Sequence, residues 1–203
     1  MWSVIPINKF SDSLSRLSPI LDIDERVRLT KNLGRRLINI LSEIDKIEKI
    51  IIFTPEIEWA KIFQEKNILV LEDTSNKSLR EKMNHVADWA QEMGANRFQY
   101  LSIDLPLASK EDIVEVMNAH DEGLTIVKAS KDGGTNTLIC DLPRPINFQF
   151  GKDSFRKHLK DAKLNKLIIN TPKIEGLSFD LDDQDDWEYF LKKYQPNKNP
   201  LII

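Results

Sequence analysis

Short apolar runs alternate with longer amphipathic stretches over residues 2–129. The apolar runs are rich in Ile, Leu and Val and are continuous, a pattern typical of strands that are buried on both faces. They lie at residues 2–7, 50–53, 68–71, 98–103 and 124–127. The pattern therefore predicts five strands in a mostly parallel sheet that is covered by helices.

Helical spacing of apolar residues marks the stretches between these runs. Residues 22–25 (Asp-Ile-Asp-Glu) have the form of a capping box, and apolar side chains then recur every third or fourth residue as far as Ile44. Further helices are predicted at residues 55–63, 79–93 and 109–120. Because parallel strands joined through helices form right-handed βαβ units, the chain is predicted to have an α/β fold.

The regular alternation ends after Ala129. The later elements are predicted to be a helix at 154–162, short strands at 167–169 and 177–179, and a final helix at 185–193. The only cysteine, Cys140, falls in an apolar run and is predicted to be buried in a strand. His85, His120 and His158 lie on predicted helices without the spacing of metal ligands, so they are predicted to be surface residues.

Length and composition place the chain among globular proteins. Its 203 residues are 41% hydrophobic and 30% charged, and we expect one domain at 1–194 and a tail at 195–203 whose apolar tip docks on the domain or a partner. A net charge of −3 provides no basic field for nucleic acid. There is no apolar run of about 18 residues and no signal-peptide pattern, so no membrane partner and a cytoplasmic location are expected. The sequence leaves open whether the protein is a monomer or a homodimer.

Two glycine turns are the most informative local features. Residues 132–138 (Asp-Gly-Gly-Thr-Asn-Thr-Leu) contain two of the seven glycines of the chain. Residues 150–155 (Phe-Gly-Lys-Asp-Ser-Phe) form a second glycine turn, which opens a predicted helix. Glycines allow the backbone to approach a ligand closely, and helix N-termini attract phosphate and carboxylate groups. We therefore expect backbone N–H groups in the two turns to bind a small, highly charged metabolite.

Acidic residues follow two of the predicted strands. Asp104 comes directly after the strand at 98–103, and Asp180 and Asp182 follow the strand at 177–179. Ligands gather at the carboxyl ends of parallel strands, and alternating carboxylates on an extended segment point to the same side. Such oxygen ligands suit Mg²⁺ that bridges phosphates. The alternatives are a turn or capping aspartate at position 104 and a solvated acidic loop after position 179.

A basic loop follows the first predicted strand. It holds Lys9 and Arg16, and it could bind the phosphates of a nucleoside triphosphate, although an ordinary surface loop is an equal alternative. No Ser–His–Asp or Cys–His pattern suited to nucleophilic catalysis is visible. This agrees with phosphoryl-type transfer, in which positioning and neutralisation of charge provide most of the catalysis.

Taken in order, these motifs resemble the 2-phospho-L-lactate guanylyltransferases of coenzyme F-420 biosynthesis, a group that includes enzymes acting on phosphoenolpyruvate and 3-phosphoglycerate. The most specific part of the resemblance is the Gly-Gly-Thr-Asn-Thr-Leu segment followed by Phe-Gly-Lys-Asp-Ser-Phe and His158. The other matching segments are residues 4–6, 15–19, 104–107 and 177–182. Together the matches extend over nearly the whole chain.

The resemblance implies a single-domain GT-A-like nucleotidyltransferase fold, which is Rossmann-like, with a mixed, mostly parallel sheet flanked by helices. It also implies GTP as co-substrate and Mg²⁺ as the metal. By match to the family motifs, the implied metal ligands are Asp104, Asp180 and Asp182. By the same match, the residues implied to bind the phosphoacid are Thr135, Gly151 and Ser154.

The implied reaction joins GTP to 2-phospho-L-lactate, phosphoenolpyruvate or 3-phosphoglycerate with release of pyrophosphate, and the sequence does not distinguish the three acids. Arg16 and Asp104 would be catalytic, and Arg16 and Lys9 would hold the nucleotide phosphates. The chain has Asn8 and Leu14 where the family usually has lysines, and Ser-Leu-Arg at 78–80 where Gly-Leu-Asn is usual. These departures leave the preferred nucleotide open. They also leave open two alternative functions, that of a non-catalytic phosphoacid-binding relative and that of a sugar-nucleotide enzyme on the same fold.

Overall fold

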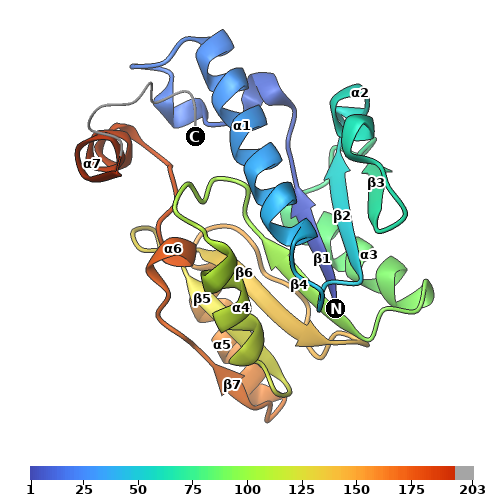
Figure 1. Ribbon diagram of the computed structural model, residues 1–203. Coiled ribbons are helices and arrows are strands. Elements are labelled where there is room, and N and C mark those ends of the chain that lie inside the picture. The colour runs from blue at the N-terminus through green and yellow to red at the C-terminus, as the bar shows by residue number, and fades with distance from the viewer. Residues whose placement is uncertain (195–203) are drawn as a thin grey trace.

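The computed structural model describes residues 1–194 and contains a seven-stranded sheet with helices on both faces (Figure 1). The predicted tail at 195–203, with its apolar tip, lies outside the described residues. The strands are β1 (Trp2–Pro6), β2 (Lys49–Thr54), β3 (Ile68–Glu72), β4 (Arg97–Leu101), β5 (Leu124–Lys128), β6 (Thr135–Asp141) and β7 (Ile169–Asn170). The helices are α1 (Ile23–Ser42), α2 (Ile57–Ala60), α3 (Leu79–Glu92), α4 (Lys110–Asn118), α5 (Ser154–Leu164), α6 (Glu175–Ser178) and α7 (Gln184–Tyr194). Short 3-10 helices are η1 (Phe10–Asp12), η2 (Ser15–Leu17) and η3 (Lys61–Phe63).

Strand direction divides the sheet into a parallel half and a mixed half. The strand order is β3-β2-β1-β4-β6-β5-β7, and β1 to β4 pair in parallel. β6 pairs antiparallel with both β4 and β5, whereas β7 pairs in parallel with β5. Because β6 runs against β4, its first residues lie beside the carboxyl end of β4. The predicted α/β fold with a mixed, mostly parallel sheet is confirmed.

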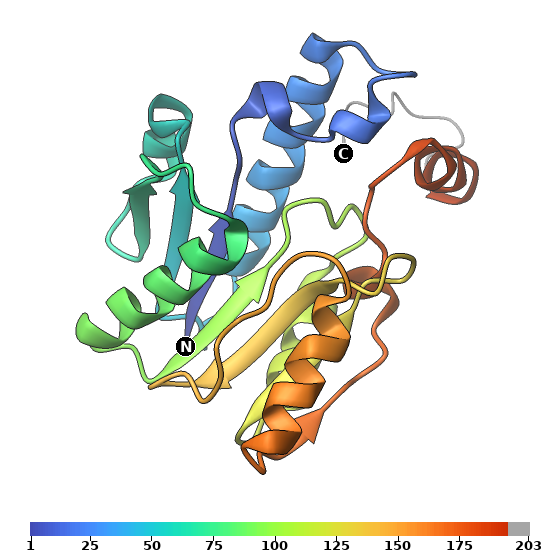
Figure 2. The same cartoon turned by 180° about the vertical axis from the view of Figure 1, so that it is seen from behind.

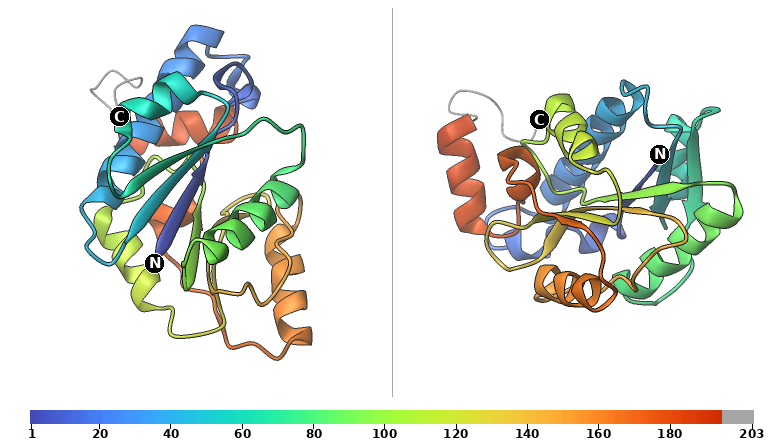
Figure 3. Two further views of the ribbon diagram at one scale, coloured as in Figure 1. Left: turned by 90° about the vertical axis from the view of Figure 1, so that its right-hand side faces the viewer. Right: turned by 90° about the horizontal axis from the view of Figure 1, so that it is seen from below.

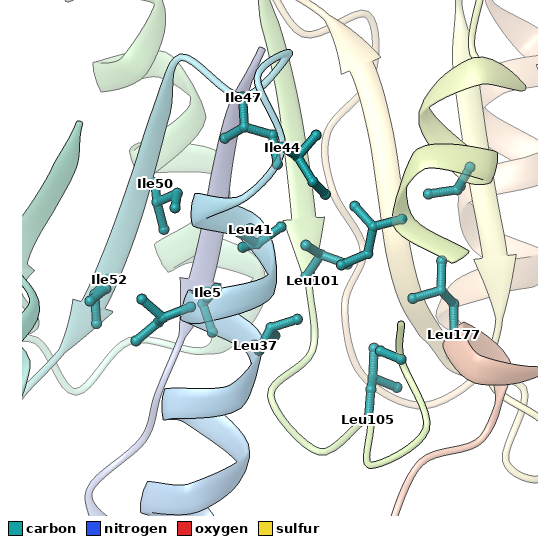
Figure 4. Packing of buried hydrophobic residues seen from close by; sticks show 14 of the residues in the cluster. Ile5, Leu37, Leu41, Ile44, Ile47, Ile50, Ile52, Leu101, Leu105 and Leu177 are labelled. Atoms are coloured by element: carbon teal, nitrogen blue, oxygen red, sulfur yellow. The ribbon is translucent and has the colours of Figure 1, made fainter. Parts of the chain in front are cut away.

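Two hydrophobic layers hold the helices against the sheet. Figures 1 and 2 show α1 and α4 on one face and α3 and α5 on the other, and the right-hand view of Figure 3 shows the sheet between them. Ile5, Leu41 and Leu101 belong to the first layer, in which Figure 4 shows the side chains interdigitating. Phe98 and Cys140 belong to the second layer, so the predicted burial of Cys140 in a strand is confirmed.

Capping boxes begin α1, α3 and α4. In α1 the Asp22 carboxylate accepts a hydrogen bond from the Glu25 N–H, and the Glu25 carboxylate accepts one from the Asp22 N–H, as the sequence predicts. Ser78 and Ser109 have the same role in α3 and α4. A cap of this kind contributes about 1 kcal/mol to stability, so the local sequence fixes where each helix begins.

One predicted strand is a helix in the structure. The segment at 177–179 lies largely in α6, where the N–H groups of Leu177 and Ser178 both donate to the carbonyl of Ile174. The prediction was wrong because Leu177 and Phe179, which are both buried, are two positions apart as in a strand. A single helical turn is too short to show helical periodicity in the sequence.

Several element boundaries also differ from the predictions, including that of the strand predicted at 167–169, which is β7 (Ile169–Asn170). The helix predicted at 55–63 begins at Ile57 as α2 and continues as η3, while the strand predicted at 98–103 ends at Leu101. The residues after Leu101 therefore form a loop at the carboxyl end of β4, which is where Asp104 lies. Among the described helices, none has both the length and the apolar character needed to span a membrane.

Candidate functional site

A cavity of about 550 Å³ lies at the carboxyl end of β4, beside the start of β6. Figure 2 shows this end of β4 at the upper edge of the sheet. Several segments that are far apart in the sequence meet there: the loop after β4, the turn between β5 and β6, the loop that opens α5, and the segment between α6 and α7. η2 and the start of α3 each add one lining residue. The cavity is lined by Arg16, Leu79, Tyr100, Ser102, Asp104, Asp132, Gly134, Thr135, Asn136, Phe150, Gly151, Lys152, Ser154, Asp180 and Asp182. The structure thus brings together every predicted site residue except Lys9.

Backbone hydrogen bonds join the two acidic segments. The N–H of Leu181, which lies between Asp180 and Asp182, donates to the carbonyl of Asp104 at 2.9 Å. The Ser102 hydroxyl donates to the Asp104 carboxylate at 2.6 Å and holds that side chain in place. Asp104 does not cap α4, since Ser109 does. The three carboxyl groups thus line one cavity at the edge of the sheet, and Asp180 and Asp182 follow a helical turn instead of the predicted strand.

Burial and mutual repulsion oppose ionisation of these carboxyl groups. Burial raises the pKa of Asp104, and the charges of Asp182 and Asp132 raise it further. Burial also raises the pKa of Asp180 to about 7, with the charge of Asp104 as the next contribution. One carboxylate oxygen of Asp180, Oδ1, is buried without a hydrogen-bond partner among the described residues. A cation placed between these groups would relieve both effects.

The donor atoms present suit a hard divalent cation. Carboxylate oxygens and the unpartnered Oδ1 of Asp180 are the ligands that Mg²⁺ prefers. Within residues 1–194 no three His, Cys, Asp or Glu side chains form a group that could hold a metal ion by themselves. A magnesium ion at this site would accordingly take one or two carboxylates and complete its coordination with water and substrate oxygens, as Mg²⁺ usually does.

The two predicted cationic residues differ in position. Arg16, in η2, forms an ion pair with Asp182, and its side chain is 65% exposed at the rim of the cavity. Burial still raises the pKa of Asp182, with the charge of Arg16 opposing that shift. Lys9 is exposed ahead of η1 and is not among the residues that line the cavity. Only Arg16 is placed to contact a ligand in the cavity as the structure stands.

Hydroxyl groups form a second polar part of the cavity lining, which we call the hydroxyl side, as distinct from the acidic side formed by the carboxyl groups. The Ser154 and Thr135 hydroxyl oxygens are 3.1 Å apart, and Thr135 Oγ1 is 3.1 Å from His158 Nδ1. Gly151 has φ +114° and Asp153 has φ +56°, so the loop folds back sharply before α5 begins at Ser154. This places the two hydroxyl groups side by side at the start of a helix, where an anion is favoured.

The backbone of the glycine turns is used differently from our expectation. The Gly134 N–H donates to the Asp132 carboxylate at 2.6 Å, and the Ser154 N–H donates to the Gly151 carbonyl at 3.0 Å. These two N–H groups stabilise the turns themselves and do not point to a ligand. Among the side chains that the turns present to the cavity are those of Thr135 and Ser154.

Two of the three histidines are buried, whereas all three were predicted to be surface residues. His158 is completely buried and His120 is 4% exposed, while His85 is exposed on α3. Each buried imidazole has a threonine partner, Thr135 for His158 and Thr125 for His120, which satisfies a polar atom that burial would otherwise leave without a bond. A histidine flanked by apolar positions on an amphipathic helix does not reveal such a partner from sequence alone.

Sequence reasoning missed Asp132 and Lys152 as lining residues. Asp132 directly precedes the paired glycines, and its carboxylate is a fourth negative group in the cavity. Lys152 lies within the second glycine turn and is one of two cationic side chains that line the cavity, the other being Arg16. Both could have been found as the charged members of the two glycine turns.

Comparison with known sequences identifies a family. The model of a family described as guanylyl transferase, CofC-like, matches residues 1–194. The chain is 30% identical to the 2-phospho-L-lactate guanylyltransferase of Methanosphaera stadtmanae over 194 residues, covering 91% of this chain and 80% of the relative. It is 28% identical to the phosphoenolpyruvate guanylyltransferase of Chloroflexus aggregans over 200 residues, covering 95% and 97% respectively.

Solved structures share the fold. A nucleotidyl transferase from Methanothermobacter thermautotrophicus is similar with a TM-score of 0.65 at 10% identity, covering 98% of this chain and 99% of that one. A candidate nucleotide-diphospho-sugar transferase from Desulfovibrio desulfuricans G20 gives a TM-score of 0.76 at 16% identity, covering 98% and 87%. The nucleotidyltransferase fold implied by the resemblance is thereby confirmed.

Proposed function

The chain belongs to the CofC-like guanylyltransferase family, and on this premise we propose that it joins GTP to a small phosphorylated acid in coenzyme F-420 biosynthesis. An oxygen of the acid's phosphate attacks the α-phosphorus of GTP, the bond between that phosphorus and the bridging oxygen to the β-phosphorus breaks, and pyrophosphate leaves. The candidate acids are 2-phospho-L-lactate, phosphoenolpyruvate and 3-phosphoglycerate. The names of the relatives support the first two.

The observation that carries the proposal is the meeting of an acidic group and a hydroxyl group in one cavity. Asp104, Asp180 and Asp182 line the same cavity as Thr135 and Ser154. Carboxylates alone would repel two anionic substrates, whereas hydroxyl donors bind phosphate and carboxylate oxygens. The cavity therefore suits a phosphoacid that lies against the hydroxyl groups and faces a cation held by the carboxylates.

The chain's own residues position the reactants. Thr135, Ser154 and the turn at Gly151 would bind the phosphoacid, and Arg16 would leave Asp182 to bind the phosphates of GTP. When bound, Mg²⁺ supplies charge neutralisation at the phosphates, and one or two of the carboxylates of Asp104, Asp180 and Asp182 would hold it. No general base is needed, because a phosphate monoester is already largely dianionic at neutral pH, its second pKa being about 6.

The test is direct assay of the purified protein. Each acid is offered with GTP or ATP and Mg²⁺, pyrophosphate release is measured, and the product is identified by mass spectrometry. We expect pyrophosphate and a guanosine diphosphate-linked adduct with at least one acid. If no combination of acid and nucleotide releases pyrophosphate, the proposed activity is excluded.

A non-catalytic phosphoacid-binding protein is the second candidate. It is favoured by one observation, that Lys9 does not line the cavity while Asn8 and Leu14 replace the lysines usual in the family. This candidate predicts that calorimetry detects binding of a phosphoacid but no binding of GTP with Mg²⁺. Measurable affinity for the triphosphate would exclude it.

A further inference from the structure

His158 lies behind the phosphoacid side of the cavity and contacts it through one hydroxyl group. The imidazole is completely buried in α5, and the rings of Phe148 and Phe150 lie edge-on to it with centroids 6.5 and 5.3 Å away. Its Nε2 is 2.7 Å from the backbone nitrogen of Gln149, and its Nδ1 is 3.1 Å from Thr135 Oγ1. His158 does not itself line the cavity.

The backbone contact fixes which imidazole nitrogen carries the proton. The Gln149 N–H can only donate, so Nε2 must be the unprotonated nitrogen. The proton of the neutral ring is then on Nδ1, and Nδ1 donates to Thr135 Oγ1. Burial, followed by the charge of Lys157, lowers the pKa of His158 to about 4, so the ring is neutral at physiological pH.

This tautomer determines what the two hydroxyl groups can donate. Between them, Thr135 and Ser154 have two hydroxyl protons, and their mutual contact at 3.1 Å uses one of them. Because His158 donates to Thr135, the hydrogen bond between them uses neither of the two hydroxyl protons. One hydroxyl proton therefore remains, and both hydroxyl groups belong to residues that line the cavity.

The opposite tautomer would remove that donor. With Nδ1 unprotonated, Thr135 would have to donate to His158, and Ser154 would have to donate to Thr135. Both hydroxyl protons would then be directed away from the cavity, which would present only lone pairs to an anionic ligand. Lone pairs repel phosphate and carboxylate oxygens, so the same residues would oppose binding.

We propose that His158 is a positioning residue for the phosphoacid: by donating from Nδ1 to Thr135, it leaves one hydroxyl proton of the Thr135–Ser154 pair for an anionic oxygen of the substrate. The contribution to binding rests on the proposed function, whereas the tautomer does not. Asn and Gln variants separate the two contacts of the imidazole. The amide nitrogen of Asn can take the place of Nδ1, while the amide oxygen of Gln can take the place of Nε2.

The experiment measures KM for the phosphoacid, KM for GTP and kcat in His158→Asn and His158→Gln. Asn retains the donor to Thr135, so we expect KM for the acid in the Gln variant to exceed that in the Asn variant by roughly 10- to 100-fold, as for a hydrogen bond to a charged group. KM for GTP should differ less than threefold between them. Equal KM values for the acid, or a lower value with Gln, would overturn the proposal.

His120 provides the matched control. It is also a buried histidine whose Nδ1 contacts a threonine hydroxyl, Thr125 Oγ1 at 3.0 Å, but it lies near Asp141 at the far end of β6 and not at the cavity. The Asn and Gln variants of His120 should show the same KM for the acid as each other. If the His120 variants instead showed the difference in KM that is expected at position 158, that difference would result from replacing any buried histidine and not from the contact with Thr135.

Nitrogen NMR of the unsubstituted protein tests the tautomer without any variant. In protein labelled with ¹⁵N histidine, His158 should show a protonated Nδ1 and an unprotonated Nε2 between pH 6 and 8. A protonated Nε2 would overturn the proposal even if turnover is normal. If no turnover is found with any substrate, the affinities of the His158→Asn and His158→Gln variants for the phosphoacids are compared by calorimetry. Failure of the proposed function can then be distinguished from failure of the role proposed for His158.

Discussion

The two sides of the cavity differ in how completely their polar groups are satisfied. On the hydroxyl side, Thr135, Ser154 and His158 hydrogen-bond to one another, and the imidazole is further fixed by a backbone N–H. On the acidic side, burial raises the pKa of Asp104 and of Asp180, and one oxygen of Asp180 has no partner within the described part of the chain. The hydroxyl side is organised before any ligand arrives, whereas the acidic side would be completed by the cation proposed above.

This difference predicts opposite effects of substitution on stability. Removing a group from the hydroxyl side breaks bonds that stabilise the fold, whereas removing a charge from the acidic side relieves repulsion. Both changes should lower activity. Stability and activity measured in the same variants therefore separate the two sides.

Asp180→Asn should cause the largest loss of activity. The amide retains the shape of the side chain but removes a charge that would hold the cation, so we expect turnover to fall by about 10²- to 10³-fold, as when a major electrostatic contribution is removed. The metal-free variant should nevertheless be more stable by about 1–3 kcal/mol at pH 8, because the raised pKa of Asp180 means that its ionised form is unfavourable in the folded state.

Pyrophosphate release and chemical denaturation measure these two effects. Asp183→Asn is a matched control, since Asp183 follows Asp182 in the same acidic segment. Its carboxylate pairs with Lys131, and this contact lowers the pKa of Asp183. That control should retain turnover and should not be stabilised. A lower free energy of unfolding for Asp180→Asn at pH 8 would show that the acidic side is not under electrostatic strain.

Thr135→Val should lower activity by less and should reduce stability. The valine methyl group fills the space of the hydroxyl but leaves His158 Nδ1 without an acceptor. It also removes the Thr135 hydroxyl group as a donor to a ligand in the cavity. We expect KM for the phosphoacid to rise roughly 10- to 100-fold and the free energy of unfolding to fall by about 1–2 kcal/mol. Thr137→Val is a suitable control, because the buried Thr137 hydroxyl has no partner among the described residues. An increase in stability for Thr135→Val would contradict the contrast between the two sides.

The stability difference between Asp180→Asn and the unsubstituted protein should depend on pH. An acid whose folded-state pKa is raised from 3.8 to about 7 costs stability at high pH, and that cost disappears as pH falls and the group is protonated. The advantage of the Asn variant should be largest above pH 7 and vanish towards pH 4. Denaturation of both proteins at several pH values measures this, and a constant difference would contradict the assigned pKa.

His158 contributes the opposite pH dependence in both proteins, so it cancels in that difference. Its pKa is lowered from 6.5 to about 4, which means that the neutral ring favours the folded state and that stability is lost as pH falls from 6.5 to 4. The full loss would be about 3 kcal/mol, since each pKa unit corresponds to 1.36 kcal/mol. The hydroxyl side therefore loses stability in acid over the range in which the acidic side gains it.

The parallel half of the sheet could be predicted from the sequence more fully than the mixed half. Its strands are continuous apolar runs separated by helices with visible caps, such as the one at Asp22, so local signals and tertiary structure agree. The placement of β6 between β4 and β5 depends on long-range pairing, for which a single sequence contains no pattern. The helical turn at α6 was mistaken for a strand for a related reason, since Leu177 and Phe179, the residue that follows α6, pack in two different hydrophobic clusters.

The acidic side of the site was predictable and the hydroxyl network was only partly so. Asp104, Asp180 and Asp182 follow apolar segments, and the carboxyl ends of strands are a general location for ligands. Thr135 and Ser154 were implied by the match of the two glycine turns to the family motifs, whereas the turns themselves predicted binding through backbone N–H groups. The bond from His158 to Thr135 depends on how α5 packs against β6, and the ion pair of Arg16 with Asp182 depends on folding of the loop after β1. Neither contact has a signal in local sequence.

Arg16→Ala and Lys9→Ala should give the smallest effects and would sharpen the contrast within the basic loop. Arg16 is at the rim of the cavity, exposed and paired with Asp182, so we expect its loss to raise KM for GTP only about 5- to 10-fold. Lys9 does not line the cavity, and its loss should change KM for GTP by less than about threefold. Steady-state kinetics with GTP as the varied substrate measures both, and an effect of Lys9→Ala equal to that of Arg16→Ala would mean that the loop moves to bring Lys9 onto the bound triphosphate.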